Sequence, residues 1–270
     1  MANVSYNDEI YLAKGLTAFG KFLPFIPSVS KIFGEEVKEA GSTVNVPLFS
    51  SNNTDNGEFN GSYDTSGSTQ TKIPVSLVHI HETFEIGAEA QSSNSFNLEN
   101  LYQTHLQNFG RKVAKAIFAD SANFTAAQSG SFGFAKVKTL AVGLDTNNVT
   151  DVERGLIVDT TIYGSLYQDT TDTLKVSPES YGFSNTAKVS TGILPSGVKG
   201  LAIAPDCYAV ACYQVRQNGK TADVKLLTDE ATGLQFTFKT FSIDNENKIK
   251  GVFEVLVGGK VAQDKAIKFV

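Results

Sequence analysis

The side chains most capable of chemistry are few and scattered along the chain. His79 and His81 are separated by one residue in an alternating segment, so they share one face of a predicted strand, a spacing that zinc sites use. The sequence places no third ligand beside them, because Glu82 points to the other face and His105 lies in a predicted helix. We therefore interpret the two histidines as ordinary strand residues and predict no metal site.

The two cysteines, Cys207 and Cys212, lie in a segment, 205–216, that we predict to be a helix beginning at a Pro-Asp pair. Five positions apart on a helix, the two thiols would point to different sides, so a disulfide between them is not expected. We predict reduced, buried thiols.

Motifs typical of enzymes are incomplete or missing. Residues 219–221, Gly-Lys-Thr, resemble the end of a phosphate-binding loop, but position 214, where that loop needs glycine, is Gln214. The sequence has no G-x-S-x-G nucleophile elbow and no G-x-G-x-x-G after a strand. The acidic pairs 35–36 and 229–230 are adjacent in sequence and typical of a solvated face. We predict a protein that is not an enzyme and that binds no cofactor.

The composition is that of an ordinary globular protein. The chain has 270 residues, of which 41% are hydrophobic and 19% charged. The net charge of -5 and the isoelectric point near 5.3 argue against a protein that holds nucleic acid through a basic surface of its own. We find no leader-like N-terminus and no apolar run of about 18 residues, so we expect neither secretion nor membrane insertion.

The longest periodic stretch runs from Phe96 to Gly130 and predicts a helix over 97–128, with Asn97 as its cap. Such a helix would be roughly 45 Å long. Since a compact chain of this size has a radius of gyration of about 18 Å, we expect a flat or elongated molecule. Gly110 costs about 1 kcal/mol in mid-helix relative to alanine, which predicts a bend or a close contact there. The residues that we expect to pack this helix are Leu98, Leu101, Phe109, Gly110, Val113 and Ile117.

Two segments carry aromatic side chains that need a covering surface. Residues 1–40 have no sustained periodicity and read as an arm, whose phenylalanines must lie either on this chain or on a neighbour. Residues 50–71 are almost entirely Ser, Asn, Thr, Gly and Asp and connect two predicted strands, 44–49 and 72–88. A long two-stranded arm that reaches a neighbouring subunit fits this segment better than a surface loop. The predicted inter-subunit contacts are Phe19, Phe22, Phe25, Phe59 and Tyr63.

The remaining segments predict an α+β protein in which helices flank sheets. Residues 133–144 fit a short helix or a strand. Residues 155–169 read as a buried strand followed by a helix capped by Asp159 or Thr160, and 200–216 repeat this strand–helix pattern. From 222 onwards we predict only strands.

The order of these parts resembles that of tailed-bacteriophage major capsid proteins with the Hong Kong 97-type fold. The resemblance covers nearly the whole chain and is carried by the strand GSTVNVP, the polar hairpin, the returning strand, the long helix, the units RGLIVDTTIYGSLYQD and GLAIAPDCYAVA, and the strand-rich tail. It implies four parts. They are an N-terminal arm at 1–40, an extended-loop hairpin with its flanking strands at 41–78, a peripheral domain at 79–147 with 221–270 that contains a spine helix at 97–128, and an axial domain at 148–220.

The resemblance also implies the function. It suggests a structural subunit that forms pentamers and hexamers and assembles, in the host bacterial cytoplasm, into an icosahedral head. That virion capsid would enclose double-stranded DNA without sequence-specific binding and without a membrane, alongside separate scaffold, portal and decoration proteins. Some relatives cross-link a lysine of the extended loop, but this loop has a lysine only at its base, Lys72, so we predict no cross-linking.

Two other functions fit the sequence less well. An encapsulin-like compartment shell would have the same fold but enclose protein cargo. A β-rich surface adhesion module would use the Ser/Asn-rich loop to bind a ligand, but it explains the long helix poorly.

Overall fold

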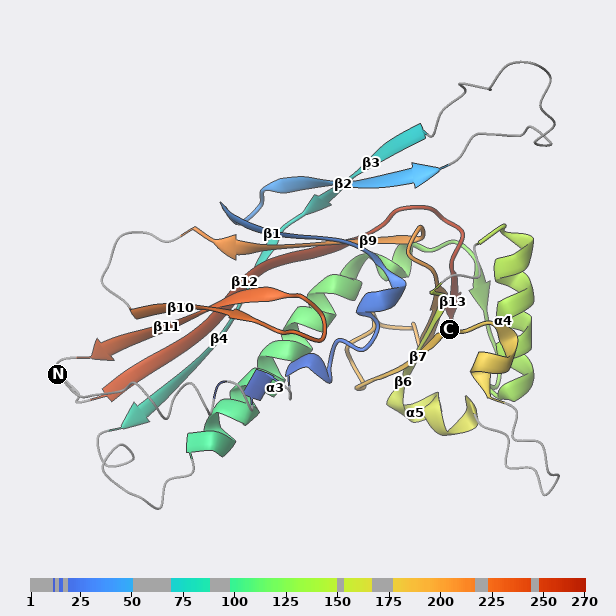
Figure 1. Ribbon diagram of the computed structural model, residues 1–270. Coiled ribbons are helices and arrows are strands. Elements are labelled where there is room, and N and C mark those ends of the chain that lie inside the picture. The colour runs from blue at the N-terminus through green and yellow to red at the C-terminus, as the bar shows by residue number, and fades with distance from the viewer. Residues whose placement is uncertain are drawn as a thin grey trace.

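The computed structural model confirms an α+β protein built around one helix (Figure 1). It describes residues 12, 15–16, 19–50, 69–87, 98–149, 153–166, 177–216, 223–243 and 248–270. Two sheets lie side by side rather than stacked, which gives the described chain an elongated outline (Figure 1). The helices whose bounds are described are α3 (Leu98–Ile117), α4 (Phe134–Thr146) and α5 (Thr160–Tyr163), with 3-10 turns at Ile26–Ser28, Phe118–Asn123, Gly164–Leu166 and Pro178–Tyr181.

The larger sheet has six strands. Five follow the order β1-β9-β12-β11-β10, and the sixth, β4, pairs with the edge of β12 opposite to β11. All of its pairs are antiparallel except that between β1 and β9. Its strands are β1 (Ser30–Lys38), β4 (Val78–Gly87), β9 (Tyr208–Val215), β10 (Asp223–Thr228), β11 (Gln235–Ile243) and β12 (Lys248–Val261).

The smaller sheet has the order β5-β13-β8-β6-β7 and lies beside α4 and α5 (Figure 1). A separate two-stranded ribbon, β2 with β3, is paired in register from Thr43 opposite Ser76 to Ser50 opposite Thr69. The strands of these two units are β2 (Thr43–Ser50), β3 (Thr69–Ser76), β5 (Ala127–Gln128), β6 (Gly155–Asp159), β7 (Asn185–Val189), β8 (Gly200–Ile203) and β13 (Ile267–Phe269).

Several local predictions are confirmed. Strand β6 leads into α5, and the Asp159 carboxylate caps that helix by accepting a hydrogen bond from the Thr161 backbone N–H at 2.8 Å. Residues 134–146 are helical, and the chain after 222 forms only strands within its described part. A Cβ added to Gly110 would lie 3.2 Å from the Phe19 carbonyl oxygen, so the expected close contact is present.

The long helix is shorter than the sequence suggested. Helix α3 ends at Ile117 instead of residue 128, which makes it about 30 Å long. The Tyr208 hydroxyl donates a hydrogen bond of 2.7 Å to the Ile117 carbonyl oxygen, and the Asp120 carboxylate accepts one from the Val261 N–H. The first contact satisfies the last carbonyl oxygen of the helix, and the second ties the next residues to β12, so the chain turns into a 3-10 segment and then β5.

The helix predicted over 205–216 is wrong. After a turn in which the Cys207 N–H donates to the Ala204 carbonyl oxygen, Tyr208–Val215 form β9 between β1 and β12. The alanines in this run favour a helix locally, but the strand is buried on both faces and tertiary pairing decides its conformation. Its partner β1 comes from the last part of the predicted arm.

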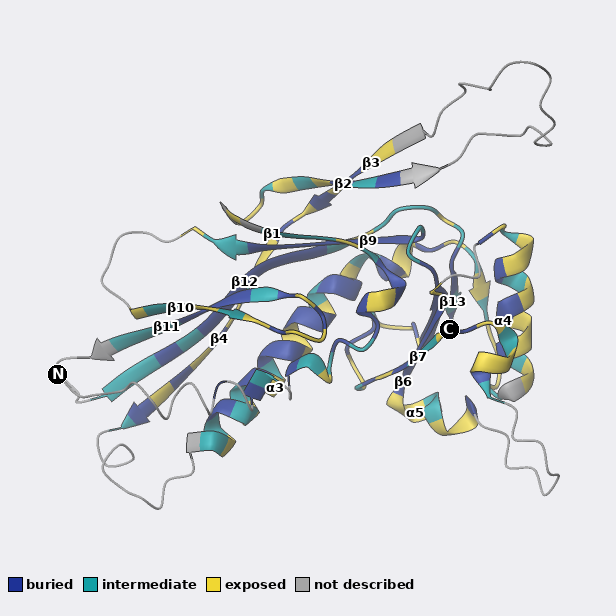
Figure 2. Cartoon of the chain, in the orientation of Figure 1, coloured by how far each residue is buried: buried dark blue, intermediate teal, exposed yellow. Residues whose placement is uncertain are grey.

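The core of the subunit is aromatic and lies between α3 and the inner face of the larger sheet. The helix buries one face there and leaves the other exposed (Figure 2). The rings of Phe19, Phe109 and Phe236 form a triangle, with Phe109 5.7 Å from Phe19 and 5.2 Å from Phe236 between ring centroids. The Phe253 side chain on β12 is fully buried and packs against Phe236 in the same cluster. This cluster fixes α3 against β11 and β12.

Candidate assembly surfaces

The two strand histidines lie beside an ion pair. His79 Nε2 is 3.4 Å from a carboxylate oxygen of Glu254 on β12, and Lys239 on β11 pairs with the other oxygen. The rings of His79 and His81 are 5.6 Å apart between centroids. Within the described ranges, no three His, Cys, Asp or Glu side chains gather so as to hold a metal ion.

A buried carboxylate that the sequence analysis did not single out connects β4 with α3. Glu82 accepts hydrogen bonds from Lys112 Nζ at 2.5 Å and pairs with His105 Nδ1 at 2.8 Å. Burial raises the pKa of Glu82, but the hydrogen bonds and charges of Lys112 and His105 outweigh it, so the net pKa lies below the ordinary value. The signal in the sequence was a carboxylate at an inward position of an alternating strand, which requires a partner.

The thiols are not poised for chemistry. Cys207 and Cys212 are both free and buried. Burial raises the pKa of each thiol to about 12, which keeps it protonated at neutral pH and therefore a poor nucleophile. The Gly-Lys-Thr sequence at 219–221 lies outside the described residues.

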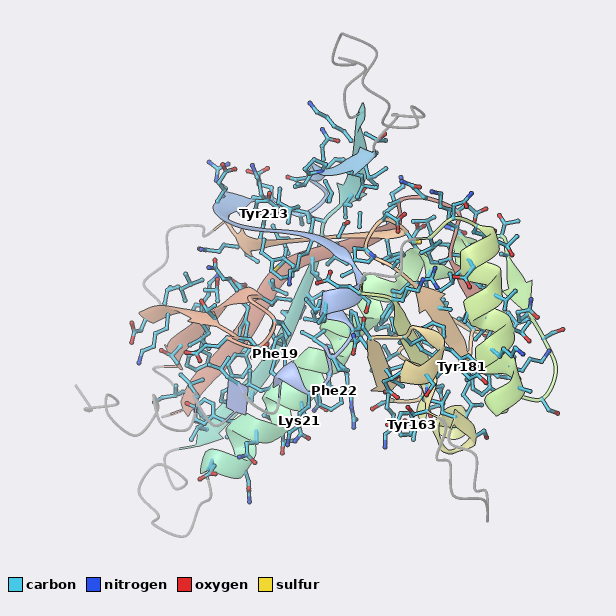
Figure 3. All side chains as sticks on the ribbon, turned by 45° about the vertical axis from the view of Figure 1, so that its right-hand side comes forward. Phe19, Lys21, Phe22, Tyr163, Tyr181 and Tyr213 are labelled. Atoms are coloured by element: carbon cyan, nitrogen blue, oxygen red, sulfur yellow. The ribbon has the colours of Figure 1, made fainter. Side chains whose placement is uncertain are left out.

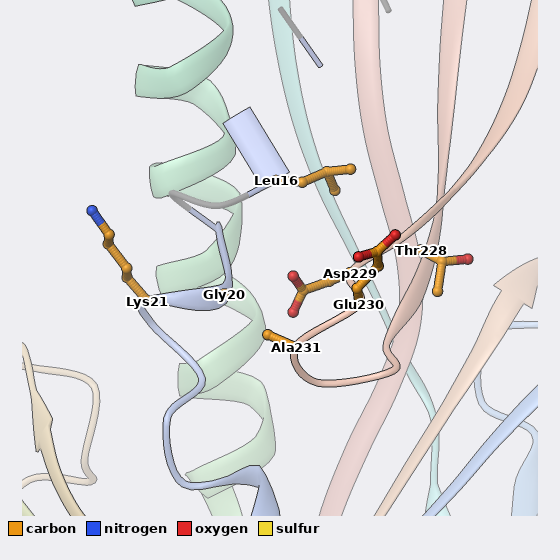
Figure 4. A pocket seen from close by; sticks show the side chains of 7 residues that line it. All are labelled: Leu16, Gly20, Lys21, Thr228, Asp229, Glu230 and Ala231. Atoms are coloured by element: carbon orange, nitrogen blue, oxygen red, sulfur yellow. The ribbon is translucent and has the colours of Figure 1, made fainter. Parts of the chain in front are cut away.

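A hollow of about 720 Å³ separates the N-terminal segment from the turn between β10 and β11 (Figure 4). The Asp229 carboxylate on its wall accepts a hydrogen bond of 2.5 Å from the Thr232 hydroxyl, so this carboxylate already has a partner within the turn. Residues 13–14 and 17–18 of the same N-terminal segment lie outside the described part, and we assign no ligand to this hollow. Its lining residues are Leu16, Gly20, Lys21, Thr228, Asp229, Glu230 and Ala231.

The aromatic side chains predicted to contact other subunits divide into three groups. Phe19 and Phe25 are fully buried in the core of their own subunit, where Phe19 packs on Phe109 and Phe25 packs on Phe118. Neither has surface left for a neighbour, so the packing assigns both to the core and not to an interface. Phe22 is half-buried beside α3 (Figure 3). Phe59 and Tyr63 lie outside the described residues.

The residues predicted to pack the long helix face the aromatic core. Phe109, Val113 and Ile117 have no exposed surface, and Leu101 packs against the core while partly exposed. The side chain of Leu98 lies outside the described part of the chain.

The ribbon of β2 and β3 covers one half of the outer face of the larger sheet. Leu48 and Val75 on the ribbon contact Tyr213 and Leu256 on the sheet in a second apolar cluster. A Cβ on Gly258 would lie 2.2 Å from the Ser76 carbonyl oxygen, so the two layers meet backbone to backbone. A two-stranded ribbon is at best marginally stable alone, and this contact holds its base in place.

The other half of the outer face is not covered by any described segment. On β10, which pairs only with β11 among the described strands, the Leu226 side chain is 47% exposed. The registers place Val224, Phe241 and Val252 on this same face, and all three are partly exposed. Ion pairs of Lys239 with Glu254 and of Lys248 with Glu85 cross the strands between them. An edge strand with apolar side chains is a surface that proteins normally protect.

No helix in the described ranges is long and apolar enough to cross a membrane.

No protein-family model and no curated protein sequence matches this chain. Solved structures do match it. One is the virus-like particle from Pyrococcus furiosus, with a TM-score of 0.59 and 9% identity over 97% of this chain and 98% of that one. Another is the capsid of cyanophage P-SCSP1u, with a TM-score of 0.50 and 14% identity over 89% and 86% of the two chains.

This protein has the capsid fold. A structure of Mycobacterium phage Bobi matches it as well, with a TM-score of 0.53 and 11% identity over 92% of this chain and 89% of that one. The matches extend over nearly the full length of both partners, as the sequence resemblance to phage capsid proteins predicted. At sequence identities this low, the structural similarity establishes the fold of this chain.

Proposed function

We propose that this protein is the major capsid subunit of a tailed phage, which assembles into an icosahedral head around double-stranded DNA. The observation that carries the proposal is the capsid fold over nearly the whole chain. Pentamers and hexamers of this subunit form the shell, and scaffold, portal and decoration proteins act with it. The protein does no catalysis in this role, and assembly takes place in the host cytoplasm.

Two features of the subunit support self-assembly. The uncovered half of the outer face carries Leu226 on an edge strand, and a neighbouring subunit would bury it. The ribbon is anchored at its base by the second apolar cluster, so Ser50 and Thr69, the paired ends of its two strands, are fixed relative to the sheet. We propose that this connection and Phe22 contact adjacent subunits, with Phe59 and Tyr63 as the apolar contacts of the loop.

The domain roles follow the same proposal. The segment 41–78 is the extended-loop hairpin with its flanking strands, 79–147 with 221–270 form the peripheral domain, and 148–220 form the axial domain at the centre of each capsomer. The axial boundary then falls within the larger sheet, because β9 pairs with both β1 and β12. Motion between these domains would therefore have to preserve that pairing.

Electron microscopy of the purified protein tests the shell. We expect closed shells tens of nanometres wide, whereas dispersed single subunits at high protein concentration would contradict the proposal. Single subunits would instead favour the adhesion module or another monomeric function.

The content of the particles separates the two kinds of shell. The likeness to the virus-like particle from Pyrococcus furiosus, which covers 97% of this chain, favours an encapsulin-like compartment as the second candidate. Nuclease-protected double-stranded DNA in particles from the native source supports the phage head, and particles that contain protein but no nucleic acid support the compartment.

A further inference from the structure

The side of α3 that faces away from the sheet is basic, although the protein as a whole is acidic. The only acidic residue of the helix is Glu99 in its first turn, and the basic residues gather in its second half. The exposed side chains of α3 are Asn100, Thr104, Gln107, Arg111, Lys112 and Lys115.

A second segment adds to this charge. Phe22 lies against α3, since its Cβ is 3.4 Å from where a Cβ of Gly110 would be, and the Arg111 guanidinium carbon lies 5.2 Å from the centre of the Phe22 ring. This cation–π contact holds Arg111 at the surface. Lys21, the preceding residue, is exposed, and its side chain points away from Asp229 and Glu230 across the hollow (Figure 4).

The nearby carboxylates do not neutralise these groups. Glu82 is buried and bonded to Lys112 and His105, and Asp229 is bonded to Thr232. No carboxylate among the described residues forms an ion pair with Lys21, Arg111 or Lys115. Within the described ranges, these three positive charges therefore have no ion-pair partner.

The opposite face of the sheet is different. There Lys239 pairs with Glu254, and Lys248 pairs with Glu85. Basic residues in the last turns of a helix also stabilise its C-terminal end, which accounts for Lys115. The helix dipole does not account for Lys21, which belongs to another segment, so the unpaired charge points to an anionic partner on the α3 side.

We propose that Lys21, Arg111 and Lys115 form a phosphate-binding patch for the backbone of the enclosed nucleic acid. The proposal rests on the shell function, because a shell presents one of its faces to its genome, and it makes the α3 side the lumenal side. Arginine suits phosphate through its paired N–H donors. Backbone contacts of this kind carry no sequence information, and each is weak, but many subunits repeat them around the shell.

Binding of a short fluorescent DNA duplex to unassembled subunits, followed by anisotropy from about 50 to 200 mM salt, tests the patch. The variant Lys21→Gln/Arg111→Gln/Lys115→Gln is expected to bind at least about tenfold more weakly at the low end of that range. The slope of log affinity against log salt should fall by about 0.9 for each phosphate contact, or about 2.7 in total.

A matched variant removes the same charge from the opposite face of the sheet, through Lys248→Gln/Lys250→Gln/Lys260→Gln. It should leave the slope unchanged, and thermal melts of both variants verify that they are folded. Equal loss of binding in the two variants would overturn the patch, since net charge alone would then explain it. Competition by polyglutamate that exceeds competition by unlabelled DNA would also overturn it, in favour of an acidic protein segment.

Microscopy of the same samples separates this proposal from the shell function. If the subunits form shells but the patch variant binds DNA like the unaltered protein, the patch fails and the shell stands. If the subunits form no shells but only the patch variant loses DNA binding, the patch stands as a polyanion site and the shell function fails.

Discussion

The two faces of the larger sheet are covered in opposite ways. On the inner face, α3 and the aromatic core leave Phe109 and Phe253 with no exposed surface, and all the contacts come from the same subunit. On the outer face, the ribbon covers Leu256 but leaves Leu226 47% exposed at the edge strand. The inner face therefore stabilises the subunit, while part of the outer face is left uncovered by the described chain, and we propose that other copies cover it. Substitutions on the two faces should separate stability from assembly.

The largest effect on stability is expected at the centre of the inner face. Phe109→Ala removes a ring that packs against Phe19, Phe236 and Phe253, and it should lower the free energy of unfolding by about 3–5 kcal/mol. Denaturant unfolding of the subunit measures this loss. A loss below about 1 kcal/mol would mean that the ring is not part of a well-packed core.

A smaller loss is expected where α3 meets the N-terminal segment. Gly110→Leu places a side chain against the Phe19 carbonyl oxygen, 3.2 Å from the new Cβ, and overpacking of this kind costs about 1–3 kcal/mol. Thr104→Leu, on the exposed side of the same helix, serves as the control and should change the melting temperature little. An unchanged melting temperature for the Gly110 variant would contradict the close contact.

The third effect depends on pH. The pKa of Glu82 is lowered in the folded protein, so its ionised form stabilises the fold above the ordinary carboxyl pKa of about 4.3. This contribution disappears as the pH falls through the lower folded pKa. Glu82→Gln should therefore reduce the free energy of unfolding at pH 7, by about 1.5–3 kcal/mol for hydrogen bonds to charged groups, and the difference from the unaltered protein should shrink on acidification.

Glu85→Gln provides the comparison on the outer face. Glu85 is half-exposed and 3.8 Å from Lys248, so its loss should change the free energy of unfolding by no more than about 0.5 kcal/mol at either pH. A constant difference for Glu82→Gln from neutral to acidic pH would show that the carboxylate charge is not what joins β4 to α3.

Structural features that depend on local sequence signals could be predicted from the sequence. The Asp159 cap, the strands of the tail and the tight contact at Gly110 each depend on a residue type at a given spacing, and all of them are present. The conformation of 208–215 depends on pairing with strands that are distant in sequence, so local helix preference misleads. Helix α3 likewise ends where the Tyr208 hydroxyl donates a hydrogen bond to the Ile117 carbonyl oxygen, and no local sequence pattern predicts this end.

The contacting surfaces were harder to predict than the fold. The aromatic content of the arm shows that Phe19 and Phe25 need cover, but composition cannot say which chain provides it, and the subunit's own core does. Glu82 was visible as an inward carboxylate, yet its partners on α3 depend on how the helix is placed against β4. Pairings between distant segments determine surfaces, whereas periodicity determines elements.

The smallest effect on stability, and the largest on assembly, is expected for the loop of the ribbon. Replacing residues 51–68 by an Asn-Gly turn preserves the pairing of Ser50 with Thr69, and the ribbon keeps its own contacts with the sheet. The free energy of unfolding of the subunit should therefore stay within about 0.5 kcal/mol. Microscopy should show few or no closed shells, because the loop would no longer reach a neighbour.

A second variant separates the length of the loop from its aromatic contacts. Phe59→Ser/Tyr63→Ser keeps the full length of the connection but removes its only large apolar groups. If those groups bind adjacent subunits, this variant should impair assembly almost as much as the deletion. Normal shells from the deletion would remove the loop from the assembly contacts altogether. Those contacts would then have to lie on the exposed edge strand β10, where Leu226→Glu should block shell formation while the subunit remains folded.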